Sequence, residues 1–186
     1  LRSWLHAMAV LDDDAALRRF LAERAVPERD IEAALRGKVV LVTGAAGSIG
    51  SELCGQIARF RPRAIVGFDQ AETALHDLEQ NLRARFPGLE FIAELGSIQD
   101  SRRVSAVFAR YQPHAVYHAA AYKHVPVLET HLFEALENNV FGTRNLTRAA
   151  AEWGTETFVL VSSDKAVRPA SVMGASKRVA ELVCLA

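Results

Sequence analysis

The chain has 186 residues, half of them apolar, and its 22 Lys and Arg residues balance 22 Asp and Glu residues. This neutral composition gives no indication of binding to nucleic acid or to an anionic membrane surface. No apolar run reaches the roughly 18 residues of a membrane span and no signal-peptide pattern occurs, so we expect a soluble, cytoplasmic segment without membrane contact. Cys54 and Cys184 belong to no CxxC or Cys/His cluster, which predicts two buried thiols and no metal site.

Residues 1–36 show helical patterns and no chemistry. Asp12–Asp14 and Pro27 each open such a pattern, which predicts two or three short helices that form a leader or packing arm. The chain starts at Leu1 and stops at Ala186 inside a helical pattern, so we expect it to be a piece of a longer protein.

From Gly37 onward, short apolar runs alternate with longer segments of helical period. We predict strands near 39–43, 64–69, 90–95, 115–119 and 157–162, and helices near 48–61, 71–86, 99–111, 131–153 and 172–184. This alternation is typical of an α/β fold with a Rossmann-type, doubly wound parallel sheet. The loops that follow the strands then meet at one edge of the sheet, where ligands bind. We therefore divide the chain into a helical appendage, 1–36, and one α/β domain, 37–186.

The most informative segment is 39–50, VVLVTGAAGSIG, in which an apolar strand pattern leads into Gly44, Gly47 and Gly50 and then into a helix. Glycine leaves no Cβ where a phosphate contacts the backbone, and the N–H groups at the start of the helix face that phosphate. Gly50 is expected to allow close packing of helix on strand. Such loops also serve as ordinary turns, but the strand before and the helix after favour dinucleotide binding.

The next strand pattern ends in Asp69, 19 residues after Gly50. A carboxylate at this position accepts hydrogen bonds from the adenosine ribose and repels a 2′-phosphate, which favours NAD over NADP. Alternatively, Asp69 caps the helix that begins near Ala71. The two roles are compatible.

The fourth strand pattern is followed by HAAAYKHVP, residues 118–126. Its three alanines allow close approach of a cofactor, and Tyr122, Lys123 and His124 bring three polar groups to the edge of the site. The alternative is a solvated loop. His118 is expected to be a packed, hydrogen-bonded core histidine.

Asn138 and Asn139 are adjacent in a predicted helix, although asparagine is a poor helix former. We expect one of the two amides to brace a loop or the substrate.

Ser163, Asp164 and Lys165 follow the fifth strand pattern directly. Neighbouring Asp and Lys side chains point to different sides of an extended chain, so they could contact two atoms of one substrate as acid and base. The alternative is a turn with a surface ion pair, which contributes little energy. Lys177 lies one helical turn after Met173, so both face the same side of the last helix.

Four segments carry a family resemblance: GKVVLVTGAAGSIGSELC, HAAAYKHVPVLE, NNVFGT and SSDKAVRPASVMGASKRVAE. From about Gly37 to Ala186 the chain resembles the cofactor half of the extended short-chain dehydrogenases/reductases. Within them it is similar to the CapD-like polysaccharide biosynthesis family of UDP-N-acetylglucosamine 4,6-dehydratases. Residues 1–36 carry little of this resemblance.

The resemblance implies NAD-dependent dehydration of UDP-N-acetylglucosamine to UDP-2-acetamido-2,6-dideoxy-hexos-4-ulose for glycan biosynthesis. Oxidation at C4 of the sugar acidifies the C5 proton, and a base removes that proton. An acid then assists loss of the C6 hydroxyl as water, and return of the hydride to C6 regenerates the cofactor.

The resemblance also implies roles for individual residues. The Tyr of the superfamily motif Y-x-x-x-K is replaced by Met173, and a thioether cannot transfer a proton. A methionine here is similar to the branch that retains the C5 configuration. In that branch Asp164 and Lys165 are the acid/base pair at C6 and C5, and Ser163 bonds O4. Lys177 holds the nicotinamide ribose and favours hydride removal.

For the cofactor we expect contacts from Gly44, Gly47, Ser48, Ile49, Gly50, Asp69, Gly96, Ser97, Ile98, Ala119, Ala120, Ala121, Lys123, Asn138 and Lys177. For the UDP-sugar we expect contacts from Tyr122, Lys123, His124 and Asn139. Where the family has Asp after the third-strand glycine, this chain has Ser97, so the adenine contact is expected to weaken or to pass to Asp100.

Extended members place much of the nucleotide-sugar site in a C-terminal lobe that this chain lacks, which leaves the activity of the segment alone open. We expect a homo-oligomer at full length, and longer members carry upstream membrane helices. A nucleotide-sugar 4-epimerase or a C5-inverting dehydratase is an alternative, against which Met173 counts. A non-catalytic NAD-binding module is another, against which the run from Ser163 to Lys165 counts.

Overall fold

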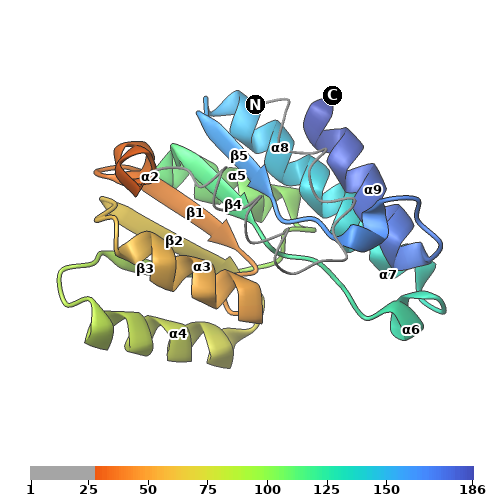
Figure 1. The fold of residues 1–186 in the computed structure, drawn as a ribbon, viewed down its shortest axis with the longest axis horizontal. Helices are drawn as coiled ribbons and strands as arrows, with labels where there is room; N and C mark the ends of the chain where they lie inside the picture. The colour runs from red at the N-terminus through yellow and green to blue at the C-terminus, as the bar shows by residue number, and fades with distance from the viewer. Residues whose placement is uncertain (1–27) are drawn as a thin grey trace, which may run out of the picture.

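The computed structural model describes residues 28–186, which form a five-stranded parallel sheet with helices on both faces (Figure 1). Across the sheet the strand order is β3-β2-β1-β4-β5, so the order reverses between β1 and β4. This is the doubly wound, Rossmann-type sheet that the sequence predicts. In chain order the strands are β1 (Val39–Thr43), β2 (Ala64–Asp69), β3 (Phe91–Leu95), β4 (Ala115–His118) and β5 (Thr157–Leu160).

The predicted helices are present, and the predicted helix 131–153 is divided into three consecutive segments. A π-helical turn, η1 (Leu136–Gly142), separates α7 (Leu132–Ala135) from α8 (Thr143–Glu152). The other helical elements are α2 (Glu28–Leu35), α3 (Ser48–Ala58), α4 (Glu72–Arg85), α5 (Ser101–Tyr111), α6 (Val125–Leu128), the short 3-10 helix η2 (Asp164–Ala166) and α9 (Val172–Leu185). The helix predicted after Pro27 is confirmed as α2. The helical pattern predicted after Asp12–Asp14 lies outside the described residues, and the division at residue 36 stays a prediction.

Both faces of β1 are buried, because alternate side chains enter different halves of the core. Val40 and Val42 pack in a cluster with side chains of α3 and α4. Val39 and Leu41 pack on the opposite face with side chains of α5 and α8, such as Phe108. This burial explains why β1 is a continuous apolar run and not an alternating one. Figure 1 shows the central position of β1 between these helical layers.

Strand β5 lies at one edge of the sheet, where within the described residues it pairs with β4 alone, and the side chains of Thr157 and Val159 are exposed. Within residues 28–186, no helix combines the length and the apolar character that a membrane span needs. In the same part of the chain no group of His, Cys, Asp or Glu side chains is arranged to hold a metal ion. In a doubly wound sheet, ligands bind where the loops meet at the carboxyl ends of the strands, next to the point at which the strand order reverses.

Candidate cofactor and active site

The turn between β1 and α3 depends on two glycines. Gly44 has a positive φ of 67°, and a Cβ built on it would lie 2.6 Å from the backbone nitrogen of Ala120. A Cβ on Gly50 would lie 2.0 Å from the carbonyl oxygen of Gly44. Both approaches are too close for a side chain, so the predicted tight packing at Gly50 is confirmed. No side chain caps the N-terminus of α3 at Gly47, which leaves that end of the helix open to the cleft.

Asp69, at the end of β2, fixes the position of this turn. One carboxylate oxygen accepts a hydrogen bond from the backbone N–H of Ala46, and the other accepts from Ala71, both at 2.9 Å. The alternative role as a helix cap is not borne out, because Asp69 bonds the N–H of Ala71, the N-cap residue of α4, and no side-chain cap bond is made there. The bond to Ala46 braces the glycine turn. A carboxylate has further lone pairs, so these two bonds leave capacity for a ribose hydroxyl.

The loops at the carboxyl ends of the strands enclose a cleft of about 520 Å³, a size that suits a cofactor or substrate. Every residue predicted to bind the cofactor lines it, and so do Tyr122, Ser163, Lys165 and Met173. Six lining residues were not predicted, although each lies beside a strand end or a predicted site residue, which is a usable signal: Ala46, Phe68, Gln70, Ala71, Val161 and Ser162. In full, the lining comprises residues 44, 46–50, 68–71, 96–98, 119–123, 138, 161–163, 165, 173 and 177.

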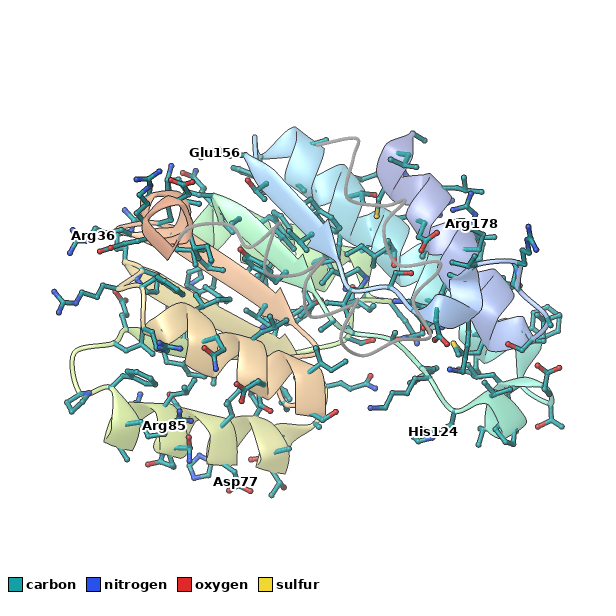
Figure 2. The ribbon with its side chains drawn as sticks, in the orientation of Figure 1. Arg36, Asp77, Arg85, His124, Glu156 and Arg178 are labelled. Atoms are coloured by element: carbon teal, nitrogen blue, oxygen red, sulfur yellow. The ribbon has the colours of Figure 1, made fainter. Side chains whose placement is uncertain are left out.

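Four residues that the sequence suggests for the site do not line the cleft: Asp100, His124, Asn139 and Asp164. Asp100 caps α5, because its carboxylate accepts hydrogen bonds from the N–H groups of Arg102 and Arg103. His124 is exposed at the start of α6, on the loop that leads away from β4 (Figure 2). Nothing in this arrangement assigns the adenine to Asp100 or the sugar to His124.

Ser163, Asp164 and Lys165 form a compact turn. The Ser163 hydroxyl donates to Oδ1 of Asp164 at 3.0 Å and accepts from the backbone N–H of Lys165 at 3.2 Å. Nζ of Lys165 lies 3.2 Å from the same Asp164 oxygen. The prediction that the two charged side chains point to different sides is wrong in this conformation, because η2 is a helical turn and not an extended chain. The alternative, a turn with a surface ion pair, is what the structure contains.

The Asp164 side chain is 75% exposed. Hydrogen bonds from Lys165 and Ser163 hold the pKa of its carboxyl below the usual value, since both bonds favour the charged form. The carboxylate is therefore ionised at neutral pH.

Met173 and Lys177 lie on the same side of α9 and both line the cleft, as their spacing predicts. Met173 is buried against Leu128 and Ala135. Nζ of Lys177 donates to the carbonyl oxygen of Val161 at 2.6 Å. Burial lowers the pKa of Lys177, because it disfavours the ammonium form, and the negative charge of Glu181 partly opposes this shift.

Asn139, in η1, braces the loop after β4. Its amide oxygen accepts from the backbone N–H of Tyr122 at 2.8 Å, and its amide nitrogen donates to the Tyr122 carbonyl and to the Ser176 hydroxyl, both at 3.0 Å. The side chain is buried and lies outside the cleft. Its capacity is taken up by protein groups, so we assign it to the loop and not to the substrate. Asn138 does line the cleft and donates to Asn139 at 3.1 Å.

His118 is the packed core histidine that the sequence predicts. Nδ1 lies 2.7 Å from the Thr43 hydroxyl and Nε2 lies 2.8 Å from the Thr143 hydroxyl. Because the Thr143 hydroxyl donates to the Asn139 carbonyl, it accepts from Nε2, and Nδ1 then accepts from Thr43. Burial, helped by the charge of Lys177, lowers the pKa of His118 to about 3, so the ring is neutral.

The model of the polysaccharide biosynthesis protein family matches residues 40–186, which include the whole cleft. The chain belongs to this family. The resemblance to the CapD-like polysaccharide biosynthesis proteins among the short-chain dehydrogenases/reductases is thereby confirmed.

Three curated relatives illustrate the likeness. The probable polysaccharide biosynthesis protein EpsC of Bacillus subtilis is 48% identical over 157 residues, which are 84% of this chain and 26% of EpsC. Capsular polysaccharide biosynthesis protein CapD of Staphylococcus aureus is 43% identical over 150 residues, 80% of this chain and 25% of CapD. An inverting UDP-N-acetylglucosamine 4,6-dehydratase of Campylobacter jejuni is 30% identical over 141 residues, 75% of this chain and 40% of that enzyme.

Among solved structures, Pen from Bacillus thuringiensis superposes with a TM-score of 0.73 at 29% identity, covering 81% of this chain and 46% of Pen. The chain thus spans between about a quarter and just under half of the length of these similar proteins.

Proposed function

We propose that this segment is the NAD-binding half of a nucleotide-sugar-modifying short-chain dehydrogenase/reductase, and specifically of a UDP-N-acetylglucosamine 4,6-dehydratase that retains the C5 configuration. One observation carries the proposal: a single cleft is lined by the glycine turn, by Asp69 and by the polar groups of Ser163, Lys165 and Lys177. A cofactor site and groups able to transfer protons are therefore adjacent. The likeness to polysaccharide biosynthesis proteins and to a 4,6-dehydratase favours this substrate class.

The cleft residues fit NAD. The uncapped N-terminus of α3 suits a pyrophosphate over Gly47–Ile49, and the carboxylate of Asp69 suits a ribose with two free hydroxyls. Lys177 would hold the nicotinamide ribose. When bound, NAD supplies a hydride acceptor for C4 of the sugar and a hydride donor for C6.

In this proposal the turn of Ser163, Asp164 and Lys165 provides the proton transfers. Lys165 removes the C5 proton, Asp164 protonates the departing C6 hydroxyl, and Ser163 hydrogen-bonds O4. Asp164 is ionised in its present exposed position, and Lys165 can accept the C5 proton only as a neutral amine. A proton must therefore first pass from Nζ of Lys165 to the adjacent Asp164 carboxylate, which prepares both the base and the acid. Covering of this turn by substrate or by a further lobe would raise the pKa of the carboxyl through desolvation.

The identity of residue 173 separates the candidate reactions. A buried thioether neither accepts nor donates the proton that an epimerase or an inverting dehydratase passes through its tyrosine. We therefore favour the retaining dehydratase. The inverting dehydratase is the second candidate, supported by the identity with the Campylobacter enzyme, and a 4-epimerase is the third. A non-catalytic NAD-binding module is the remaining candidate for the isolated segment.

The deciding experiment incubates the full-length protein with UDP-N-acetylglucosamine and follows the product by NMR. We expect a 4-keto-6-deoxy sugar with the C5 configuration retained. A C5-inverted product or a C4 epimer would establish the corresponding alternative, and NAD binding without turnover would establish the non-catalytic module.

The residue roles are tested in the same assay. Asp164→Asn and Lys165→Ala should each lower kcat by roughly 10²–10⁴, the usual contribution of a positioned acid or base, with little change in NAD affinity. Asp77→Asn on α4 is a matched control, because Asp77 is an exposed carboxylate away from the cleft (Figure 2). Near-normal turnover in either active-site variant would remove that residue from the mechanism.

A further inference from the structure

The loop between β5 and α9 is attached to α9 at three points. Nζ of Lys177 bonds the Val161 carbonyl at 2.6 Å. A Cβ on Gly174 would lie 2.2 Å from the Lys165 carbonyl oxygen, so helix and turn are in close contact there. The third attachment is a short hydrogen bond from the Ser162 hydroxyl to the carboxylate of Glu181.

Glu181 has no role in the function proposed above, yet its environment is unusual for a glutamate on a helix. Its side chain is only 12% exposed, and both oxygens are used. One accepts from Ser162, and the other accepts from Arg178 at 2.8 Å, on the side of α9 where Figure 2 labels that arginine. Glu181 also lies one helical turn after Lys177, and its negative charge stabilises the ammonium form of that lysine, which raises the pKa of Lys177.

The hydrogen bond between Ser162 and Glu181 matters because of where Ser162 lies. Ser162 lines the cleft and directly precedes Ser163, Asp164 and Lys165. Ser163 is half-buried and Asp164 and Lys165 are exposed, whereas Ala166 is the buried residue of the turn. A charge-assisted hydrogen bond from a hydroxyl to a largely buried carboxylate is stronger than one between neutral groups.

We propose that Glu181 is a positioning residue, which holds Ser162 and thereby fixes the turn of Ser163, Asp164 and Lys165 against α9 beside Lys177. The catalytic consequence rests on the function proposed above, whereas the attachment of the loop does not. Loss of the bond should increase opening of the loop by about tenfold or more, the range expected for a hydrogen bond to a charged group.

The test uses three variants of the full-length protein: Glu181→Leu, Ser162→Ala and Glu181→Gln. Glutamine keeps an oxygen that can accept from Ser162 but loses the charge. Glu152→Gln, at an exposed position on α8, is the control. Amide hydrogen exchange over residues 161–168 measures loop opening, and kcat with UDP-N-acetylglucosamine and Kd for NAD measure function.

We expect faster exchange over 161–168 and a lower kcat in Glu181→Leu and in Ser162→Ala, with little change in Kd for NAD. Glu181→Gln should restore most of both properties. The double variant Ser162→Ala with Glu181→Leu should be no worse than Glu181→Leu alone, because that change already removes the bond to Ser162. Wild-type exchange in Glu181→Leu, damage in Glu181→Gln equal to that in Glu181→Leu, or additive effects would each overturn the proposal. Because exchange needs no turnover, a wild-type protein that fails to dehydrate the sugar would refute the proposed function and leave the attachment measurable.

Discussion

Replacement of Gly50 by Ala tests how closely α3 packs on the glycine turn. The added Cβ would lie 2.0 Å from the carbonyl oxygen of Gly44 and 2.8 Å from Cα of Ala45. Both are backbone atoms, so no side-chain rotation relieves the overlap. An ordinary Cβ contact is 3.4–4 Å, so α3 or the turn would have to move by roughly 1 Å or more.

Gly55 provides a control on the same helix. A Cβ on Gly55 would lie 3.6 Å from Nη1 of Arg85, which is an ordinary contact with a flexible side chain. Ala in place of Gly in a helix interior, as at Gly55, favours folding by up to about 1 kcal/mol, and any gain at Gly50, in the first turn of α3, is no larger. Overpacking costs Gly50→Ala a further 1–3 kcal/mol or so, which should appear as the difference between the two variants in free energy of unfolding.

Urea unfolding measures that difference, and calorimetric titration with NAD measures the site. We expect Gly55→Ala to bind NAD normally and Gly50→Ala to bind it more weakly, since the displaced atoms form the proposed pyrophosphate site. Equal unfolding free energies and equal NAD affinities in the two variants would refute the reasoning.

Three further predictions follow from the buried and cleft residues. Because the pKa of His118 is about 3 in the folded chain and near 6.5 when unfolded, the unfolded chain takes up a proton that the native state refuses. Stability should therefore fall by about 2 kcal/mol as pH drops from roughly 7 to 5, measured by urea unfolding. Asp69→Ala should weaken NAD binding and relax discrimination against NADP, measured by titration with both cofactors. Met173→Leu should cost little in kcat because volume and apolarity are nearly conserved, and Met173→Tyr should not be faster.

Each of these three predictions would be contradicted by a specific measurement. A stability that does not change over this pH range would mean that His118 is protonated in the native state. Tighter binding of NADP than of NAD by the unmutated protein would overturn the argument from Asp69. A Met173→Tyr variant that runs markedly faster, or that gives the C5-inverted product, would show that a base was lost at this position and not replaced.

The strands and most of the helices could be predicted from the sequence, because their patterns are local. The cleft followed from topology, since parallel strands bring residues as distant as Gly44 and Lys177 to one edge. The π-helical turn could not be predicted. Its Asn139 bonds the backbone of Tyr122, a contact that depends on how η1 lies beside the loop after β4.

The relative orientation of the Asp164 and Lys165 side chains could not be predicted from the sequence either. Adjacent residues alternate only on an extended chain, and here the chain turns, with Ser163 accepting from the N–H of Lys165. The turn is set by contacts with α9, among them the close approach of Gly174 to Lys165. Such contacts join residues from separate elements, so residue types alone do not reveal them.

The meeting of three backbone segments at Gly44 has a consequence for engineering. Its Cα faces the chain at Ala120, and its carbonyl oxygen lies beneath Gly50. The backbones of the loop after β4 and of the first turn of α3 thus both pack directly against Gly44, without side chains between them. A graft that exchanges only the β1–α3 loop for that of an NADP-dependent homologue should misfit at Ala120, so swaps of cofactor preference in this scaffold should transplant both loops together.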